Sequence, residues 1–143
     1  MGSDHAGWEP PEPFYKPSVV EYLESLGHEV VDCGPCEPGS VDYPDFAGKV
    51  AEAILSGEAE MGVLLCGTGI GISMAANRHK GIRAAVCVRP EMAYVTREHN
   101  NANVICLGTR LLTLRECYGL IDIFLSTPFS DGERHHRRIN KLD

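Results

Sequence analysis

The stretch from residue 61 to residue 77 constrains the fold more than any other part of the sequence. An apolar run, 61–65, leads to Cys66, and a glycine then stands at every second position before a helix-like segment, 72–77. A strand, a glycine loop and a helix in this order place bare backbone N–H groups at a turn, which is a typical anion site. The alternative is a tight packing turn with a buried structural cysteine. The three glycines are Gly67, Gly69 and Gly71.

Short apolar runs alternate with amphipathic segments along the rest of the chain. This alternation, with brief connections, predicts an α/β fold: a three-layer, Rossmann-like parallel sheet with helices on both faces, in a single domain over residues 1–143. Ligands of such sheets bind beyond the carboxyl ends of the strands, and Cys66 lies at such an end. The expected strands are 29–33, 61–66, 82–88 and 104–107, and the expected helices are 18–26, 45–55, 72–78, 91–99 and 113–125.

Composition and charge exclude several classes of partner. The net charge of −7 argues against nucleic acid or an anionic membrane as the main partner. No apolar run approaches the ~18 residues of a membrane span, and the polar start does not resemble a signal peptide. Six cysteines in such a chain favour reduced thiols and a cytoplasmic location.

Four polar stretches lie where a strand should hand over to a loop or a helix. They are 3–7, the Cys66 loop, 96–103 and 133–138, the last of which is expected to be helical. Arg134 and Arg138 are four residues apart and would share one helix face, where two guanidinium groups fit a phosphate. Taken alone, a histidine such as His99 is more often a helix cap, and a terminal arginine cluster is usually just solvated.

Together these motifs resemble the ribose-5-phosphate isomerase type B family, which includes the sugar-phosphate isomerases of the LacA/LacB group. The resemblance covers nearly the whole chain, with the motifs in the right order. The residues that carry it are Gly2-Ser3-Asp4-His5-Ala6-Gly7, Ser40-Val41-Asp42-Tyr43-Pro44-Asp45-Phe46, Cys66-Gly67-Thr68-Gly69-Ile70-Gly71, Arg97-Glu98-His99-Asn100 and Arg134-His135.

The resemblance implies a cofactor-free and metal-free aldose–ketose isomerase that interconverts ribose 5-phosphate and ribulose 5-phosphate. Cys66 matches the base that moves a proton between C2 and C1, and Thr68 with the loop N–H groups would stabilise the enediolate. Asp4 and His99 match the groups that open the furanose ring. Implied substrate contacts come from His5, Gly67, Gly69, Gly71, Ser73, Asn100, Arg110, Arg134 and Arg138, with the phosphate on His5, Arg134 and Arg138.

The same resemblance implies a homodimer, with pairing into a tetramer left open and each site built from both subunits. Two other functions remain as alternatives. One is an isomerase for another sugar phosphate, such as allose 6-phosphate, galactose 6-phosphate or a tetrose phosphate. The other is a non-catalytic module that binds sugar phosphates, which the set of Cys66, His99 and Asp4 argues against.

Two regions depart from the family pattern. Family members have an apolar strand directly before the Ser-Asp-His motif, whereas here only Met1 and Gly2 precede Ser3. A parallel sheet with a truncated first strand should have a gap lined by unpaired backbone groups, so we expect Asp4 and His5 to be poorly anchored. The segment 8–17 contains four prolines and is expected to be a loop, with a neutral surface role favoured over a role in substrate choice.

The Cys33-Gly34-Pro35-Cys36 sequence has the spacing of a thioredoxin-type redox motif. A redox site needs its first cysteine at a helix N-terminus. The residues that follow, 37–40, include Pro and Gly and cannot continue as a regular helix. A redox or zinc role is therefore disfavoured, and an ordinary loop is expected.

Overall fold

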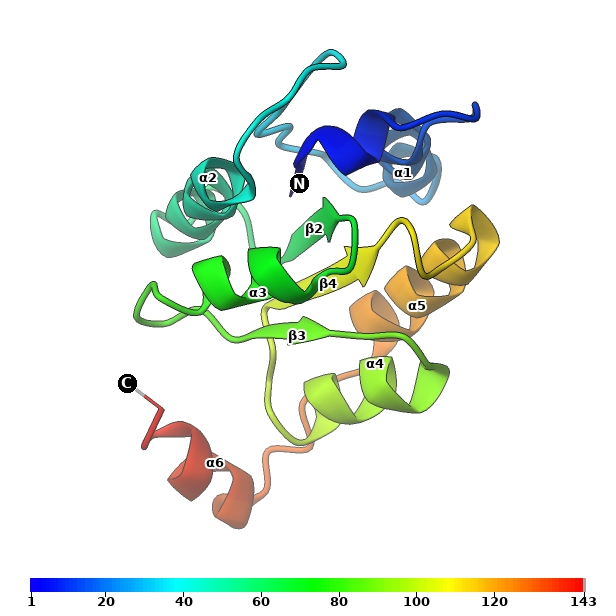
Figure 1. The fold of residues 1–143 in the computed structure, drawn as a ribbon. Coiled ribbons are helices and arrows are strands. Elements are labelled where there is room, and N and C mark those ends of the chain that lie inside the picture. The colour runs from blue at the N-terminus through cyan, green and yellow to red at the C-terminus, as the bar shows by residue number, and fades with distance from the viewer. Residues whose placement is uncertain (143) are drawn as a thin grey trace.

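The computed structural model describes residues 1–142, so that Asp143 lies outside it. Four parallel strands form one sheet in the order β1-β2-β4-β3, with helices on both faces (Figure 1), which confirms the predicted architecture. The strands are β1 (Gly2–Ser3), β2 (Gly62–Cys66), β3 (Ala84–Val86) and β4 (Val104–Gly108), and the helices are η1 (His5–Trp8), α1 (Tyr15–Ser25), α2 (Tyr43–Leu55), α3 (Ile70–Ala76), α4 (Pro90–Glu98), α5 (Leu114–Ser126) and α6 (Glu133–Ile139).

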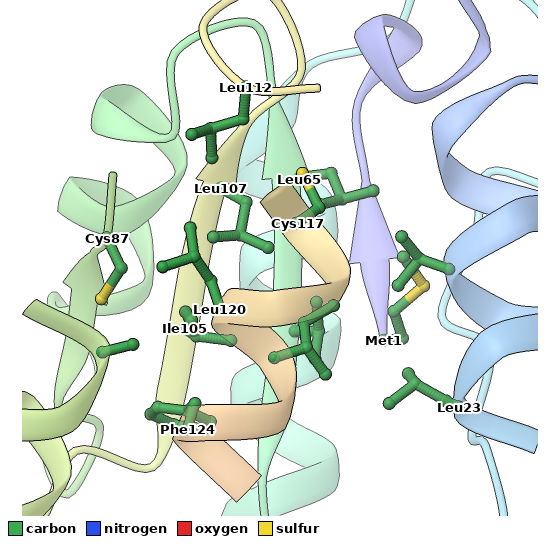
Figure 2. Packing of buried hydrophobic residues seen from close by; sticks show 14 of the residues in the cluster. Met1, Leu23, Leu65, Cys87, Ile105, Leu107, Leu112, Cys117, Leu120 and Phe124 are labelled. Carbon is green, nitrogen blue, oxygen red and sulfur yellow. The ribbon is translucent and has the colours of Figure 1, made fainter. Parts of the chain in front are cut away.

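The sheet separates two hydrophobic cores because successive side chains of a strand point to opposite faces. Every residue of β2 and β4 is buried, as expected of parallel strands covered on both sides. Leu64 packs with α2 and α3 on one face. Leu65 and Ile105 pack on the other face with Leu120 and Phe124 of α5 (Figure 2). The two central strands therefore hold both helix layers.

The first strand is short, but it occupies its place in the sheet. Gly2 pairs with Leu64 in parallel register, and Ser3 pairs with Leu65. On the other side of β1, the Met1 ammonium donates to the Val31 carbonyl at 2.6 Å. A cavity of about 530 Å³ lies beside Met1, between residues 28–31 and the start of β2.

Several expected element boundaries are corrected by the structure. Residues 29–33 form no regular strand. The segment nevertheless runs beside β1, because the Cys33 amide donates to the Met1 carbonyl at 2.8 Å. Helix α1 begins at Tyr15, two residues before Pro17, because a proline in the first turn needs no amide donor there. Helix α3 begins at Ile70, directly after Gly69, and not at residue 72.

Both ends of the proline-rich segment 8–17 are packed against the protein, whereas residues 10–13 are exposed. The Trp8 indole N–H donates to the Pro35 carbonyl at 3.1 Å, and the Trp8 ring lies 5.8 Å from the Phe14 ring. The Tyr15 hydroxyl donates to the Leu112 carbonyl at 2.6 Å. Within residues 1–142, no helix is long and apolar enough to cross a membrane.

Substitution of Phe124 tests the larger core. The ring is fully buried, and the Arg97 guanidinium lies 5.6 Å from its centroid. We expect Phe124→Ala to lower the free energy of unfolding by about 3–5 kcal/mol, since the cavity lies between a helix and the sheet and cannot collapse fully. Urea denaturation followed by circular dichroism measures this change. Leu55→Ala, at the half-exposed end of α2, is the control and should change stability by only about 0.5 kcal/mol; equal losses would contradict the prediction.

Candidate active site

Cys66 lies at the carboxyl end of β2 and is almost completely buried. The Gly69 amide donates a hydrogen bond to its Sγ atom at 3.1 Å, which fixes the direction of the thiol. The Asp4 amide donates to the Leu65 carbonyl at 3.1 Å, so the register of β1 on β2 continues one step and sets Asp4 beside Cys66. Adjacent strands lie about 4.8 Å apart, so these two residues lie next to each other at one edge of the sheet.

The loop after Cys66 is shaped by close packing at its glycines. Gly69 has φ 78° and precedes α3, a left-handed conformation that favours glycine. A Cβ on Gly108, at the end of β4, would lie 2.7 Å from the Thr68 carbonyl carbon, so the loop fits only against a residue without a side chain. A Cβ on Gly67 would likewise collide with the Arg110 guanidinium, and a Cβ on Gly71 with the ring of Tyr43.

The polar side chains of this loop differ in their availability to a substrate. Thr68 is exposed, and its Oγ1 accepts a hydrogen bond from the Ile70 amide at 3.3 Å. Because that oxygen accepts from the backbone, the Thr68 hydroxyl proton can be donated outward. Ser73 is buried, and its hydroxyl donates to the Ile70 carbonyl at 2.7 Å within the helix.

Asp4 is buried and well anchored, so the expectation of poor anchoring was wrong for this residue. Its carboxylate accepts the Ala6 amide at 2.8 Å and caps η1. Burial raises the pKa of Asp4 above its usual value, and the Ala6 hydrogen bond opposes this shift only in part. His5 follows, with its Nδ1 3.4 Å from the Val41 carbonyl oxygen. A carboxyl group with a raised pKa next to a thiol is suited to proton transfer.

Arg110 completes this edge of the sheet. Its amide donates to the Gly67 carbonyl at 3.0 Å. Its guanidinium donates to both carboxylate oxygens of Glu9, with Nε 2.9 Å from Oε2. These hydrogen bonds lower the pKa of Glu9. Glu9 was not predicted as a site residue, because nothing in a proline-rich loop indicates that it folds back onto Arg110. We call the group of Asp4, His5, Cys66, Thr68 and Arg110 the thiol edge.

The remaining predicted side chains form a second group, which we call the histidine edge: His99, Asn100, Arg134 and Arg138. His99 follows α4, and its Nε2 lies 3.0 Å from the Glu98 carboxylate. Its ring stacks on the buried ring of His135, with centroids 4.7 Å apart. The groups His99, Arg134 and His135 line a cavity of about 440 Å³.

His135 connects the two ends of the histidine edge, although no role was predicted for it. The Arg134 Nε–H donates to its Nε2 at 3.3 Å. Burial, and then the charge of Arg134, lower the pKa of His135, which favours a neutral ring. The matched Arg134-His135 motif contained the signal for this residue. The sequence could not predict that α6 contacts the end of α4, where the His99 and His135 rings stack.

The two edges lie at opposite ends of the strands. The Gly62 amide, at the start of β2, donates to the Asn103 carbonyl, which shortly follows His99 in the chain. Cys66 is the last residue of β2, so four residue steps, about 13 Å, separate the two ends. In Figure 1, α6 lies away from the ends toward which β2 and β4 point. Within one chain, His99 therefore does not meet Cys66.

The Cys33–Cys36 segment has no geometry of a thioredoxin-type site. Cys33 is half-buried, Cys36 is exposed, and both are free thiols. Neither lies at a helix N-terminus, since residues 29–41 form neither helix nor strand. No cluster of three potential metal ligands occurs among residues 1–142. The structure is consistent with the expected ordinary loop.

A parallel α/β sheet with a thiol, a carboxyl group and an arginine at the carboxyl ends of its strands is typical of an enzyme that acts on a small molecule, because ligands of such sheets bind at these ends. The family model described as Ribose/Galactose Isomerase matches residues 1–142. The chain therefore belongs to the ribose/galactose isomerase family.

Individual relatives agree with this assignment. Ribose-5-phosphate isomerase B of Escherichia coli is 39% identical over 142 residues, covering 99% of this chain and 91% of that protein. A putative sugar phosphate isomerase of Rickettsia bellii is 41% identical over 143 residues, covering 100% and 95%. The crystal structure of a ribose 5-phosphate isomerase RpiB from Thermotoga maritima matches with a TM-score of 0.92 and 52% identity, covering 99% of this chain and 94% of that one.

The raised pKa of Asp4 predicts a trade between stability and activity. Because the folded pKa lies above the unfolded value, ionised Asp4 destabilises the fold; this penalty is absent below pH 3.8 and complete above the folded pKa. We expect Asp4→Asn, which keeps an acceptor for the Ala6 amide, to unfold at the same or a higher temperature at pH 7. Any gain should disappear as the pH falls toward 3.8. Isomerase turnover should fall by about 10²- to 10⁴-fold.

Thermal unfolding from pH 3 to pH 8 and turnover at pH 7 give the two readouts for Asp4→Asn. A variant that unfolds at a markedly lower temperature at pH 7 would show that the charge itself is needed for the fold. Turnover close to that of the unmodified protein would remove Asp4 from proton transfer.

Proposed function

We propose that this chain is an aldose–ketose isomerase that interconverts ribose 5-phosphate and ribulose 5-phosphate. The proposal depends mainly on one observation: Cys66 and Asp4 occupy neighbouring backbone positions at the carboxyl ends of adjacent strands. Family membership supports the reaction class. The relative from Escherichia coli supports the pentose phosphate as the substrate. The six free cysteines of the present chain suit a cytoplasmic enzyme.

Each step of the proposed reaction is assigned to a residue of the chain. Asp4 and His99 open the furanose ring by taking the proton of the anomeric hydroxyl and giving one to the ring oxygen. The Cys66 thiolate then removes the proton from C2 and returns it to C1, with an enediolate between the two transfers, while the hydroxyl proton of O2 passes to O1. The outward Thr68 hydroxyl donates to the enediolate oxygen. No electrons leave the substrate, so the reaction needs no redox partner.

The separation of the two edges supports a site shared between two copies of the chain. His99, Asn100, Arg134 and Arg138 lie at the end of the sheet opposite Cys66, so a single subunit holds the base without the second ring-opening group. In a two-fold symmetric dimer, the histidine edge of one subunit faces the thiol edge of the other, and two equal sites result. Arg134 and Arg138, both exposed, then bind the phosphate together with His5.

Removal of the thiol tests the base. Cys66→Ala should lower turnover of ribose 5-phosphate by about 10²- to 10⁴-fold while the protein still folds, because proton transfer at carbon depends on the thiolate. A coupled spectroscopic assay measures turnover, with allose 6-phosphate and galactose 6-phosphate as competing substrates. Cys36→Ala, which removes an exposed thiol, is the control and should stay fully active.

Three outcomes of this assay distinguish the possible functions. Turnover by Cys66→Ala above a tenth of the normal rate would assign the base to another group. Faster turnover of a six-carbon phosphate would change the substrate. Binding of sugar phosphates without isomerisation by the unmodified protein would support a non-catalytic module.

A mixture of two inactive variants tests the shared site. Cys66→Ala damages the thiol edge and His99→Ala the histidine edge, so a mixed dimer keeps one intact site. Co-expression, or refolding of the two variants together at equal amounts, should restore about a quarter of the normal activity per subunit. Each variant handled alone in the same way is the control. A mixture no more active than its components would show that each site lies within one chain.

A further inference from the structure

The Glu9 carboxylate lies between the Arg110 guanidinium and the His5 imidazole of the thiol edge. Both of its oxygens accept hydrogen bonds from the Arg110 guanidinium, and its Oε1 lies 4.0 Å from Nε2 of His5. A carboxylate bound by a guanidinium fork, with an imidazole nearby, has the surroundings that a phosphate oxygen requires. Glu9 therefore occupies, from within the chain, the place beside Arg110 where a phosphate would bind.

Packing holds Glu9 in this position. Its amide donates to the Ala6 carbonyl at 3.5 Å at the end of η1. The preceding residue, Trp8, is anchored by its indole hydrogen bond to the Pro35 carbonyl. The backbone on the N-terminal side of Glu9 is thus fixed by these contacts, which keeps its side chain within reach of Arg110.

The ion pair is nevertheless open to a ligand. The Arg110 side chain is 56% exposed and the Glu9 side chain 36% exposed. The pair lines a cavity of about 370 Å³ between the proline-rich segment and the turn after β4. Because water screens an exposed pair, its net contribution is small and a stronger anion can replace it.

We propose that Glu9 is an internal competitor for the anionic group of the substrate, and that a phosphate monoester binds by displacing its carboxylate from Arg110 and His5. This inference rests on the proposed function for the identity of the substrate but not for the displacement itself. A phosphate near neutral pH carries about −1.5 to −2 charges and offers three acceptor oxygens, so it outcompetes a single carboxylate. A sugar without phosphate has only neutral hydroxyls and leaves the pair closed. Glu9 thus weakens the binding of a phosphate monoester, whereas an unphosphorylated sugar does not displace it.

The matched pair Glu9→Gln and Glu12→Gln tests this role. Both changes remove one negative charge from the same loop, but only Glu9 is hydrogen-bonded to Arg110. The readouts are the dissociation constant of inorganic phosphate from titration calorimetry, and KM and kcat for ribose 5-phosphate. We expect Glu9→Gln to lower the phosphate dissociation constant and KM about two- to fivefold, the range of an exposed ion pair, with kcat unchanged. Glu12→Gln should alter none of them.

Each other result has a definite meaning. Unchanged or weaker phosphate binding by Glu9→Gln, or equal gains in both variants, would overturn the competitor role and leave Glu9 as a support for Arg110 or a general charge effect. Tighter phosphate binding by Glu9→Gln alone, in a protein that isomerises no sugar phosphate, would support the competitor and reject the proposed function. Normal isomerisation, with no effect of Glu9→Gln on the phosphate dissociation constant, would support the proposed function and reject the competitor role.

Discussion

The close approach of the loop 66–70 to the end of β4 is the contact on which the site depends. The Thr68 backbone lies so near Gly108 that a Cβ on the glycine would be 2.7 Å from it. This contact holds the loop down on the sheet, and the left-handed Gly69 then directs its amide at the Cys66 sulfur. With the loop fixed, the Gly67 carbonyl accepts the Arg110 amide. The thiol and the guanidinium are thus positioned by one piece of backbone packing.

The glycines of this loop show both what the sequence could predict and what it could not. Their spacing after an apolar run correctly predicted a strand, a tight loop and a helix, because those preferences are local. The glycine spacing also suggested that these residues expose their backbone N–H groups to an anion. Gly67 and Gly71 instead leave room for Arg110 and Tyr43, which are distant in sequence. The spacing of the glycines and the turn that they favour can be derived from one stretch of chain. The distant residue that packs against each glycine cannot.

The N-terminal region was the least predictable part of the fold, for a related reason. Lys16 is only 2% exposed and forms an ion pair with Asp32, whose carboxylate also accepts the Gly34 amide at 2.8 Å. Burial alone would raise the pKa of Asp32, but these partners lower it below its usual value. The pair ties α1 to the segment that was expected to be a strand. Local sequence predicts a loop and a strand here, and it contains no sign that a lysine and an aspartate meet in the interior.

The distribution of charge between the two edges gives the proposed dimer a further role. The chain has a net charge of −7, and on the thiol edge Glu9 offsets the positive charge of Arg110. Arg134 and Arg138 are exposed on the other edge. In the proposed dimer, most of the attraction for a phosphate at each thiol edge therefore comes from the facing subunit. Association would then bring together the proton-transfer groups and add Arg134 and Arg138 to the anion site, so that a separated subunit would bind phosphate more weakly and lack turnover.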